Sequence, residues 1–235
     1  MKPILFKSKL LEIEKLNSET KILTFSTPKD FEFSAGQYVM MAFYKDGKRV
    51  LRSYSMFSPP SEKGRIKIYF KIVKEGYSSN YLFNMKVGEE IEMKGPLGIF
   101  TVKGEVMEKD VLMISSGTGF APFMSMTKDL IEKRFKNKII LIRGFRKEED
   151  LCCEKELKRL SQENKNFEYY NILSQPENKG HLLTGHAQDF LEKLTPKDFK
   201  GDFYICGLKD MVLETREKLL SSGISPERIY FERYD

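Results

Sequence analysis

The first hundred residues alternate between short apolar runs and turn signals. Six stretches mix apolar and polar positions in this way, namely FKSKLLEIEKL, TKILTFSTP, GQYVMMAFY, KRVLRSYSM, RIKIYFKIV and EEIEMKG. Turn-forming residues stand between them, at Pro28, at Gly36 and in segments 45–48, 62–65 and 86–90. Short strands separated by Gly or Pro are typical of all-β folds. This half is therefore predicted to form an antiparallel barrel or sandwich.

From about residue 110 the pattern changes to strands that alternate with amphipathic helices. The expected strand and helix pairs are DVLMIS with PFMSMTKDLIEKRF, KIILIRGF with EEDLCCEKELKRLSQEN, FEYYNILS with AQDFLEKL, and DFYICG with DMVLETREKLLSSG, before a last strand RIYFERYD. This alternation predicts a parallel sheet with helices on its faces, which binds ligands at the carboxyl ends of its strands. Two domains are expected, residues 1–104 and residues 105–235.

The composition of the chain argues against several classes of protein but does not identify the function. The chain has 235 residues, of which 40% are hydrophobic and 31% charged, and a net charge of +6. No apolar run is long enough for a membrane span, and Lys7 interrupts the N-terminal apolar run, so we expect a cytoplasmic protein without a signal peptide. The lysines are scattered, which argues against nucleic acid as a partner. Three cysteines without a CxxC pair and two histidines argue against a metal site, so redox chemistry would need an organic cofactor.

The segment VLMISSGTGFAPFMSM contains a candidate phosphate loop. Gly117 and Gly119 follow a strand and would let the backbone approach a pyrophosphate at the start of a helix. Pro122 stands where a dinucleotide fingerprint would have its third glycine, and it suits the first turn of a helix. The alternative is a Gly-Pro turn between core elements.

Three further segments in the strand-rich half carry candidate ligand groups. In RSYS, Arg52 could grip a phosphate, Tyr54 could lie on a planar heterocycle, and Ser55 could hydrogen-bond a ring nitrogen. The segment KEGYSSNYL offers a turn at Gly76 followed by two serines for a phosphate. GPLGIF would let a flat group approach the backbone. Taken alone, RSYS also fits an edge strand with an exposed Arg and a core Tyr.

In this order, these motifs resemble the ferredoxin–NADP reductase superfamily over essentially the whole chain. The matching segments are GQYV from residue 36, RSYS from 52, GYSSNYL from 76, GPLGIF from 95, GTGFAPFMSM from 117, YICG with Met211, and FERY from 231. The resemblance implies an N-terminal Greek-key barrel that binds FAD and a C-terminal α/β domain that binds NADPH or NADH, with the two rings stacked at the domain cleft.

The resemblance also implies roles for individual residues. The catalytic set would be Ser55 near flavin N5, Cys206 beside the nicotinamide C4, and the near-terminal acid Glu232, with Tyr234 next to it. The cofactor-binding set implied for the barrel is Arg52, Ser53, Tyr54, Ser55, Phe70, Lys71, Ile72, Gly76, Tyr77, Ser78 and Ser79. The corresponding set for the second domain is Thr118, Gly119, Pro122, Arg146, Cys206, Gly207 and Met211. The alternatives without a catalytic role are an inert core thiol at Cys206 and a solvated acid at Glu232.

The function implied is hydride transfer from a nicotinamide to flavin N5, followed by electron transfer to a redox protein or a small-molecule acceptor. Arg143, Arg146 and Lys147 follow the second parallel strand, where each could bind a ribose 2′-phosphate. The resemblance implies that Arg146 binds the 2′-phosphate. The position that usually holds a second ligand of this phosphate is Gln175 here, which would leave the phosphate half-bound, so NADPH is only slightly favoured. A reductase of free flavins, a subunit of a larger redox complex and a non-enzymatic binding module are the alternatives. Cys152 and Cys153 are expected on a helix, and His181 and His186 in loops or caps.

Overall fold

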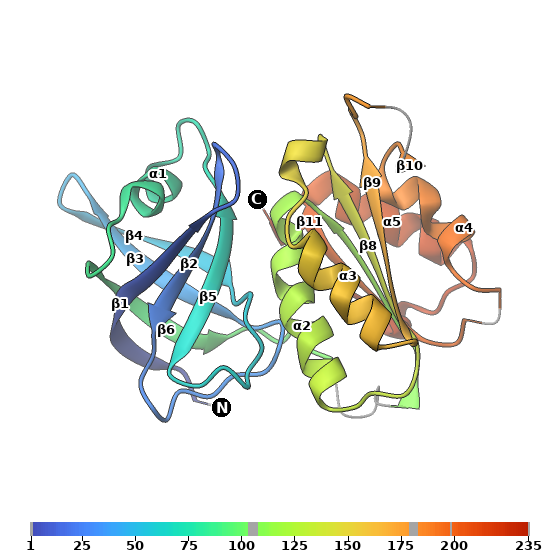
Figure 1. Cartoon of the computed structure of the whole chain (residues 1–235), viewed down its shortest axis with the longest axis horizontal. Coiled ribbons are helices and arrows are strands. Elements are labelled where there is room, and N and C mark those ends of the chain that lie inside the picture. The colour runs from blue at the N-terminus through green and yellow to red at the C-terminus, as the bar shows by residue number, and fades with distance from the viewer. Residues whose placement is uncertain (1, 103–107, 179–182, 198, 235) are drawn as a thin grey trace. The chain divides into compact units, whose positions relative to one another are not determined.

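A computed structural model describes residues 2–102, 108–178, 183–197 and 199–234 (Figure 1). The chain forms two compact units. Unit 1 comprises residues 1–101 together with 121–129, and unit 2 comprises residues 102–120 and 130–235. The expected domain boundary between residues 104 and 105 lies outside the described residues.

Unit 1 is built on a six-stranded antiparallel sheet in the order β4-β3-β6-β1-β2-β5. The strands are β1 Ile4–Lys15, β2 Thr20–Ser26, β3 Tyr38–Lys45, β4 Lys48–Ser55, β5 Arg65–Lys71 and β6 Glu90–Leu97. The sheet curls because β1 pairs with β6 through its first half and with β2 through its second half, and the register of the β1–β2 pair shifts between Leu10 and Glu12. A register shift of this kind bends a strand and increases its twist.

The inner face of the curled sheet carries the core of unit 1. Alternate positions of the strands point inward, which is the pattern read from the sequence. The most completely buried members include Leu10, Leu23, Phe25, Val39, Met41, Phe43, Ile66, Ile68 and Met93. One helix, α1 Tyr77–Asn84, follows β5 and was not predicted from the sequence.

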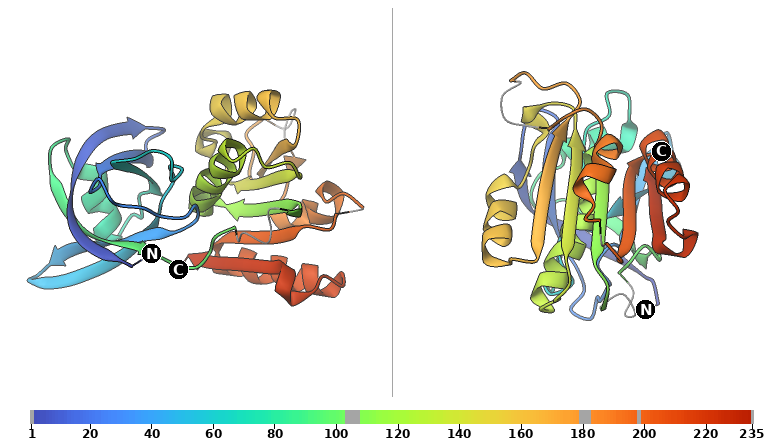
Figure 2. Two further views of the ribbon diagram at one scale, coloured as in Figure 1. Left: turned by 90° about the horizontal axis from the view of Figure 1, so that it is seen from below. Right: turned by 90° about the vertical axis from the view of Figure 1, so that its right-hand side faces the viewer.

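Unit 2 is a parallel sheet in the order β10-β9-β8-β7-β11-β12. Its strands are β7 Val111–Ser116, β8 Ile139–Phe145, β9 Phe167–Leu173, β10 Leu183–Thr184, β11 Asp202–Leu208 and β12 Ile229–Tyr234. The helices of the second half of the chain are α2 Phe120–Glu132, α3 Glu154–Glu163, α4 Leu191–Leu194 and α5 Lys209–Ser221. Helices α3 and α5 lie on opposite faces of the sheet (Figure 2). The predicted antiparallel barrel followed by a parallel α/β sheet is therefore confirmed.

The order of the strands creates a switch point in unit 2. From β7 the chain proceeds through β8 and β9 to β10, and it then returns to place β11 on the other side of β7. Ligands of open parallel sheets bind at the carboxyl ends of the strands at such a reversal. The segments that follow β7 and β11 are therefore the candidate ligand-binding segments of unit 2. Among the described residues, no helix is long and apolar enough to cross a membrane.

Candidate functional site

The residues expected to hold a flavin lie along the two edges of the barrel sheet. β4 and β5 are the edge strands, linked by an isolated bridge between Met56 and Ile68. Arg52 and Tyr54 are two residues apart on β4 and so point to the same face of the strand. The ring of Tyr54 meets that of Phe70 on β5 edge to face, with centroids 6.5 Å apart. The structure therefore brings the RSYS segment and the end of β5 together.

The ring of Tyr54 is half-buried where β4 meets the end of β5. It also packs edge to face against Phe43, at 6.4 Å. Burial raises the pKa of Tyr54 to about 12, and the charge of Arg52 opposes that rise. The phenol therefore stays neutral at physiological pH and offers an uncharged flat surface.

The other expected flavin residues of the two edge strands differ in their exposure and in their contacts. Arg52 is exposed, and its guanidinium donates to the carbonyl of Leu51 at 2.8 Å. Ser53 is exposed and Ser55 is buried. The Lys71 ammonium pairs with Glu19 at 3.1 Å, and the Ile72 amide donates to the Glu19 carbonyl at 2.8 Å.

The start of α1 provides donors suited to a phosphate. Gly76 caps the helix without a side-chain hydrogen bond, so first-turn amides remain available. Ser79 Oγ accepts from the Val73 amide at 3.0 Å and lies 3.1 Å from the Gly76 carbonyl, so it holds the preceding loop. Ser78 Oγ is buried and has no hydrogen-bond partner. A Cβ on Gly76 would lie 2.8 Å from Ser79 Oγ, which explains the glycine.

These features fit a nucleotide phosphate in unit 1. A buried hydroxyl without a partner costs free energy unless a ligand satisfies it, and a helix N-terminus favours an anion. The neighbouring Tyr77 extends the surface, since its hydroxyl donates to the Tyr44 carbonyl and its ring lies 5.7 Å from the Lys45 ammonium.

In unit 2 the glycine loop packs directly against the end of β11. Gly117–Gly119 form a single 3-10 turn between β7 and α2. A Cβ on Gly119 would lie 2.3 Å from the Cys206 carbonyl oxygen, and one on Gly207 would lie 2.3 Å from Ser116 Oγ. The Leu208 amide donates to Ser116 Oγ at 3.1 Å. The two segments expected to hold the nicotinamide nucleotide thus meet at the switch point. Ser116 was not predicted from the sequence, although its place just before the glycine loop could have indicated it.

The remaining expected residues of this region gather around the same contact. Cys206 is fully buried, and Glu232 stands beside it in register on β12. Burial raises the pKa of the Cys206 thiol well above its usual value; Glu232 adds to this rise, and a hydrogen bond with Tyr234 opposes it. Met211 is buried, and its methyl group would lie 2.8 Å from a Cβ on Gly207. Cys206 is therefore a neutral thiol at physiological pH.

The other residues of the predicted loop also occupy consistent positions. Thr118 is half-buried in the 3-10 turn. Pro122 lies in the first turn of α2, as expected, where its missing N–H leaves no helical hydrogen bond unmade.

Hydrogen bonds and an ion pair join the loops that follow β8 and β9. The Gln175 amide donates to the Arg146 carbonyl at 2.8 Å, and Lys147 pairs with Glu177 at 3.1 Å. The Glu148 carboxylate accepts the amides of Glu177 and Asn178, each at 2.9 Å. These backbone hydrogen bonds lower the pKa of Glu148, while the hydrogen bond to Glu177 raises that of Lys147.

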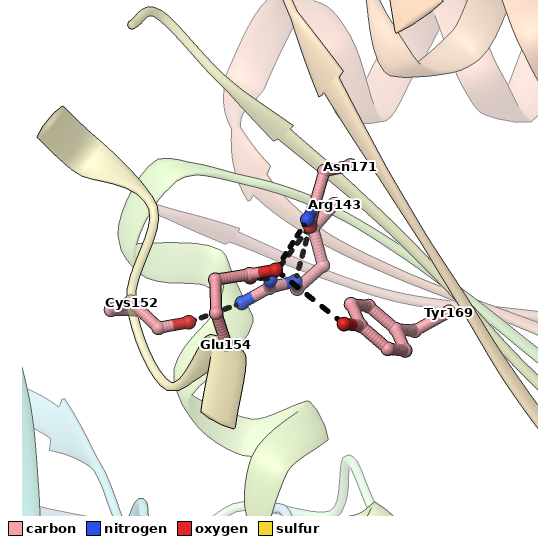
Figure 3. A network of polar contacts seen from close by, with 5 residues as sticks. All are labelled: Arg143, Cys152, Glu154, Tyr169 and Asn171. Carbon is pink, nitrogen blue, oxygen red and sulfur yellow. Dashed lines mark hydrogen bonds and ion pairs between the residues drawn. The ribbon is translucent and has the colours of Figure 1, made fainter. Parts of the chain in front are cut away.

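Arg143 is not available to a ribose phosphate, contrary to the sequence-based expectation. Arg146 is exposed. The side chain of Arg143 is fully buried and pairs with Glu154 (Figure 3). Its burial could not be predicted from the local sequence, because its partners Glu154 and Asn171 lie 11 and 28 residues away.

The expectations for the other cysteines and the histidines had mixed outcomes. Cys152 and Cys153 do not lie on a helix: α3 begins at Glu154, because Cys153 caps it in the left-handed conformation with φ of 60°. A hydrogen bond with Cys152, together with burial, raises the pKa of Cys153. His186 is a helix cap, as expected, and its side chain takes part in a capping box with Asp189. His181 lies outside the described residues.

Comparison with known proteins gives each half of the chain a family. Residues 7–102 match the family described as Oxidoreductase FAD-binding domain, and residues 113–217 match Oxidoreductase NAD-binding domain. NADH-cytochrome b5 reductase 1 of Meyerozyma guilliermondii is 30% identical over 236 residues, which cover 97% of this chain and 83% of that protein. The chain belongs to the ferredoxin–NADP reductase superfamily.

Other members of the superfamily are similar over shorter shares of their length. The Anthranilate 1,2-dioxygenase electron transfer component of Acinetobacter baylyi is 28% identical, with 88% of this chain and 59% of that protein covered. NADH-cytochrome b5 reductase 1 of Dictyostelium discoideum is 32% identical over 68% of this chain and 57% of its own. The chain thus spans less than two thirds of the length of these two relatives.

A solved structure shows the same fold at lower sequence identity. The ferredoxin NADP+ reductase of Neisseria gonorrhoeae, with bound FAD and NADP, has a TM-score of 0.85 and 22% identity, covering 97% of this chain and 98% of that one. At this identity the likeness shows that the two chains share a fold.

Proposed function

We propose that this superfamily member is an NADH-dependent flavoprotein reductase, which holds FAD as a bound cofactor and passes electrons to a separate acceptor. The observation that carries the proposal is the contact between the glycine loop and Cys206–Gly207, which gathers Cys206 and Glu232 at the switch point of a NAD-binding domain. When bound, FAD would accept at N5 the hydride that NADH releases from C4 and would release the two electrons singly.

The residues of unit 1 would hold the FAD and orient it. Ser78 Oγ and the first-turn amides of α1 would bind the pyrophosphate, and Arg52 would neutralise part of its charge. Tyr54 would pack on the isoalloxazine ring, and Ser55 would donate to N5. The backbone of Phe70 and Lys71 would meet the pyrimidine edge, because an edge strand leaves backbone groups unpaired on one side. Ile72, whose amide already bonds to Glu19, would lie next to them.

The residues of unit 2 would hold the nicotinamide nucleotide. Thr118 and the glycine loop would bind its phosphates and ribose, and Pro122 and Met211 would line the site. Cys206, as a neutral thiol, would press the nicotinamide into place without attacking it. Glu232 would orient the ring or relay a proton.

The electrostatics of the loops beyond β8 and β9 favour NADH, which reverses the slight lean of the sequence towards NADPH. Among the described residues of these two loops, Arg146 and Lys147 are the cations that remain once Arg143 is buried, and Lys147 already pairs with Glu177. Glu148, Glu149 and Asp150 follow directly in the sequence. A 2′-phosphate would meet more negative than positive charge there, and like charges at close range repel.

The charge distribution along the chain supports an acidic acceptor. Residues 1–101 contain 17 basic and 11 acidic side chains, whereas residues 102–235 contain 23 of each. The whole net charge of +6 therefore lies in the FAD-binding half. A surface of one sign raises the association rate of a partner of the other sign, so we propose a redox protein with an acidic face.

The proposal is tested by the cofactor that the purified protein retains. The wild-type protein should be yellow and should contain about one FAD per chain, released on denaturation and identified by chromatography. Arg52→Ala should lower the affinity for FAD by roughly ten-fold or more, because a hydrogen bond to a charged group contributes about 1.5–3 kcal/mol. Arg49→Ala, on the same strand, is the matched control. Equal FAD affinity in Arg52→Ala and wild type would remove the phosphate role from Arg52.

A further inference from the structure

Arg143 places a charged side chain in the interior of unit 2. It lies on β8 with Ser115 of β7 and Asn171 of β9 beside it in register, and its exposed fraction is 0%. A buried cation is costly unless its donors are satisfied. Its partners therefore show what the side chain holds together.

Three polar groups satisfy the guanidinium in a closed network (Figure 3). Nε and Nη2 donate to Asn171 Oδ1, at 3.1 and 2.6 Å. Nη1 donates to the Cys152 carbonyl at 2.8 Å, and Nη2 also pairs with the Glu154 carboxylate. Asn171 Nδ2 closes the ring by donating to Glu154 Oε2 at 2.9 Å. The network therefore anchors the end of the connection that carries Arg146 and the first residue of α3.

The flat faces of the same guanidinium contact aromatic rings. Its central carbon lies 4.7 Å from the ring centroid of Phe120 and 5.3 Å from that of Phe145. Phe120 is the first residue of α2 and follows the glycine loop directly. One side chain therefore touches the residue next to Gly119 as well as the far end of the Arg146 connection.

We propose that Arg143 is a positioning residue for the nicotinamide nucleotide. By bonding Cys152 and Glu154 while it packs on Phe120, it fixes the two loops that would receive the nucleotide relative to each other. The proposal rests on the proposed function, since it names the residue that organises the nucleotide site of unit 2.

Two physical arguments favour this role over one in stability alone. Apolar side chains of similar volume often stabilise a protein as well as a buried ion pair does, so a network of this kind is weak evidence for stability. The planar fork of arginine also has donors in fixed directions, which a lysine ammonium lacks. Arg143 donates to three partners in two chain segments, Cys152 and Glu154 at the start of α3 and Asn171 on β9, which requires such a fork.

The test compares variants of the full-length, FAD-loaded protein. Arg143→Lys keeps the charge and loses the fork. Arg143→Met combined with Glu154→Met removes the network without leaving an unpaired charge, so that unit 2 can stay folded if the lysine variant does not. Arg228→Lys is the matched control, because Arg228 donates to the Gly201 carbonyl at 2.9 Å, just before the amino end of β11 and thus away from the loops. Calorimetric titration with NAD+, thermal melting and steady-state kinetics with NADH are the measurements.

The Met–Met variant should melt close to wild type and keep its FAD, while its Kd for NAD+ rises at least about ten-fold, because small misplacements of binding groups are costly. Its KM for NADH should rise with less change in kcat. Arg143→Lys, where folded, should behave alike, and Arg228→Lys should bind NAD+ as wild type does. A folded Met–Met variant that binds NAD+ as tightly as wild type would overturn the positioning role. A wild-type protein that does not bind NAD+ would instead overturn the proposed function, and the first titration shows this.

Discussion

At the scale of single residues, the neighbouring serines 78 and 79 have different tasks. Ser79 hydrogen-bonds backbone groups of Val73 and Gly76, so it maintains the turn that leads into α1. Ser78 is buried and without a hydrogen-bond partner. A buried polar group without a partner is a feature that proteins keep at sites of function. Ser79 therefore stabilises the turn, and we propose that Ser78 is kept for the phosphate.

Ser78→Ala should weaken FAD binding without destabilising the FAD-free protein. Removing a hydroxyl that makes no hydrogen bond in the folded chain removes a desolvation cost, so the melting temperature of the apoprotein should stay equal or rise. The Kd for FAD, measured by fluorescence quenching, should rise roughly ten-fold. Ser79→Ala is the control and should lower the melting temperature of the apoprotein. An unchanged FAD affinity in Ser78→Ala would contradict the phosphate assignment.

At the scale of elements, the contact between the glycine loop and β11 is the tightest approach among the candidate nucleotide residues. Gly119 sits against the backbone of Cys206 and Gly207, whereas Gly117 has open space around its Cα but a φ of +51°. Both glycines are needed for different reasons, one for close approach and the other for backbone conformation.

Replacing each glycine by alanine should give graded effects on nucleotide binding. Gly119→Ala would force apart the two segments of the switch point, so NAD+ binding should be lost while FAD stays bound. Gly117→Ala introduces only left-handed strain of about 1 kcal/mol, so NAD+ binding should persist. Calorimetric titration of the two FAD-loaded variants makes the comparison. Equal affinities in the two variants would contradict the importance of the close approach.

The joined loops beyond β8 and β9 should determine the preference for NADH over NADPH. Glu177→Lys would free Lys147 and add a cation, so the ratio of kcat/KM for NADPH to that for NADH should rise about ten-fold. Glu163→Lys, on the exposed end of α3, is a matched charge reversal and should leave the ratio unchanged. No change in the Glu177→Lys ratio would show that these loops do not meet the ribose.

At the scale of the whole molecule, the sequence was sufficient for the order of the long strands and of the helices between the parallel strands, but not for the short elements α1 and β10. Alternation with a period of two and the glycine turns predicted the strands of unit 1, and repeated strand and helix patterns predicted the parallel sheet. These signals are local. The motif residues Gly119 and Cys206 were placed together because the carboxyl ends of parallel strands share one edge.

The features that sequence reasoning missed depend on long-range contacts or weak local signals. Helix α1 is eight residues long and lacks a capping side chain, so the GYSSNYL segment reads as a turn. The burial of Arg143 depends on Asn171, which is 28 residues away. The start of α3 after Cys153 depends on one left-handed residue that helix propensity does not reveal.

Hydride transfer from NADH to the bound flavin can be followed by anaerobic mixing of the FAD-loaded protein with NADH in a stopped-flow spectrophotometer. One equivalent of NADH should bleach the absorbance of the bound flavin within the turnover time of the protein. In Cys206→Ala the reduction of the flavin should be markedly slower with FAD still bound, since the side chain that holds the nicotinamide in place would be shortened. A flavin absorbance that neither NADH nor NADPH changes in the wild-type protein would rule out hydride transfer to the flavin.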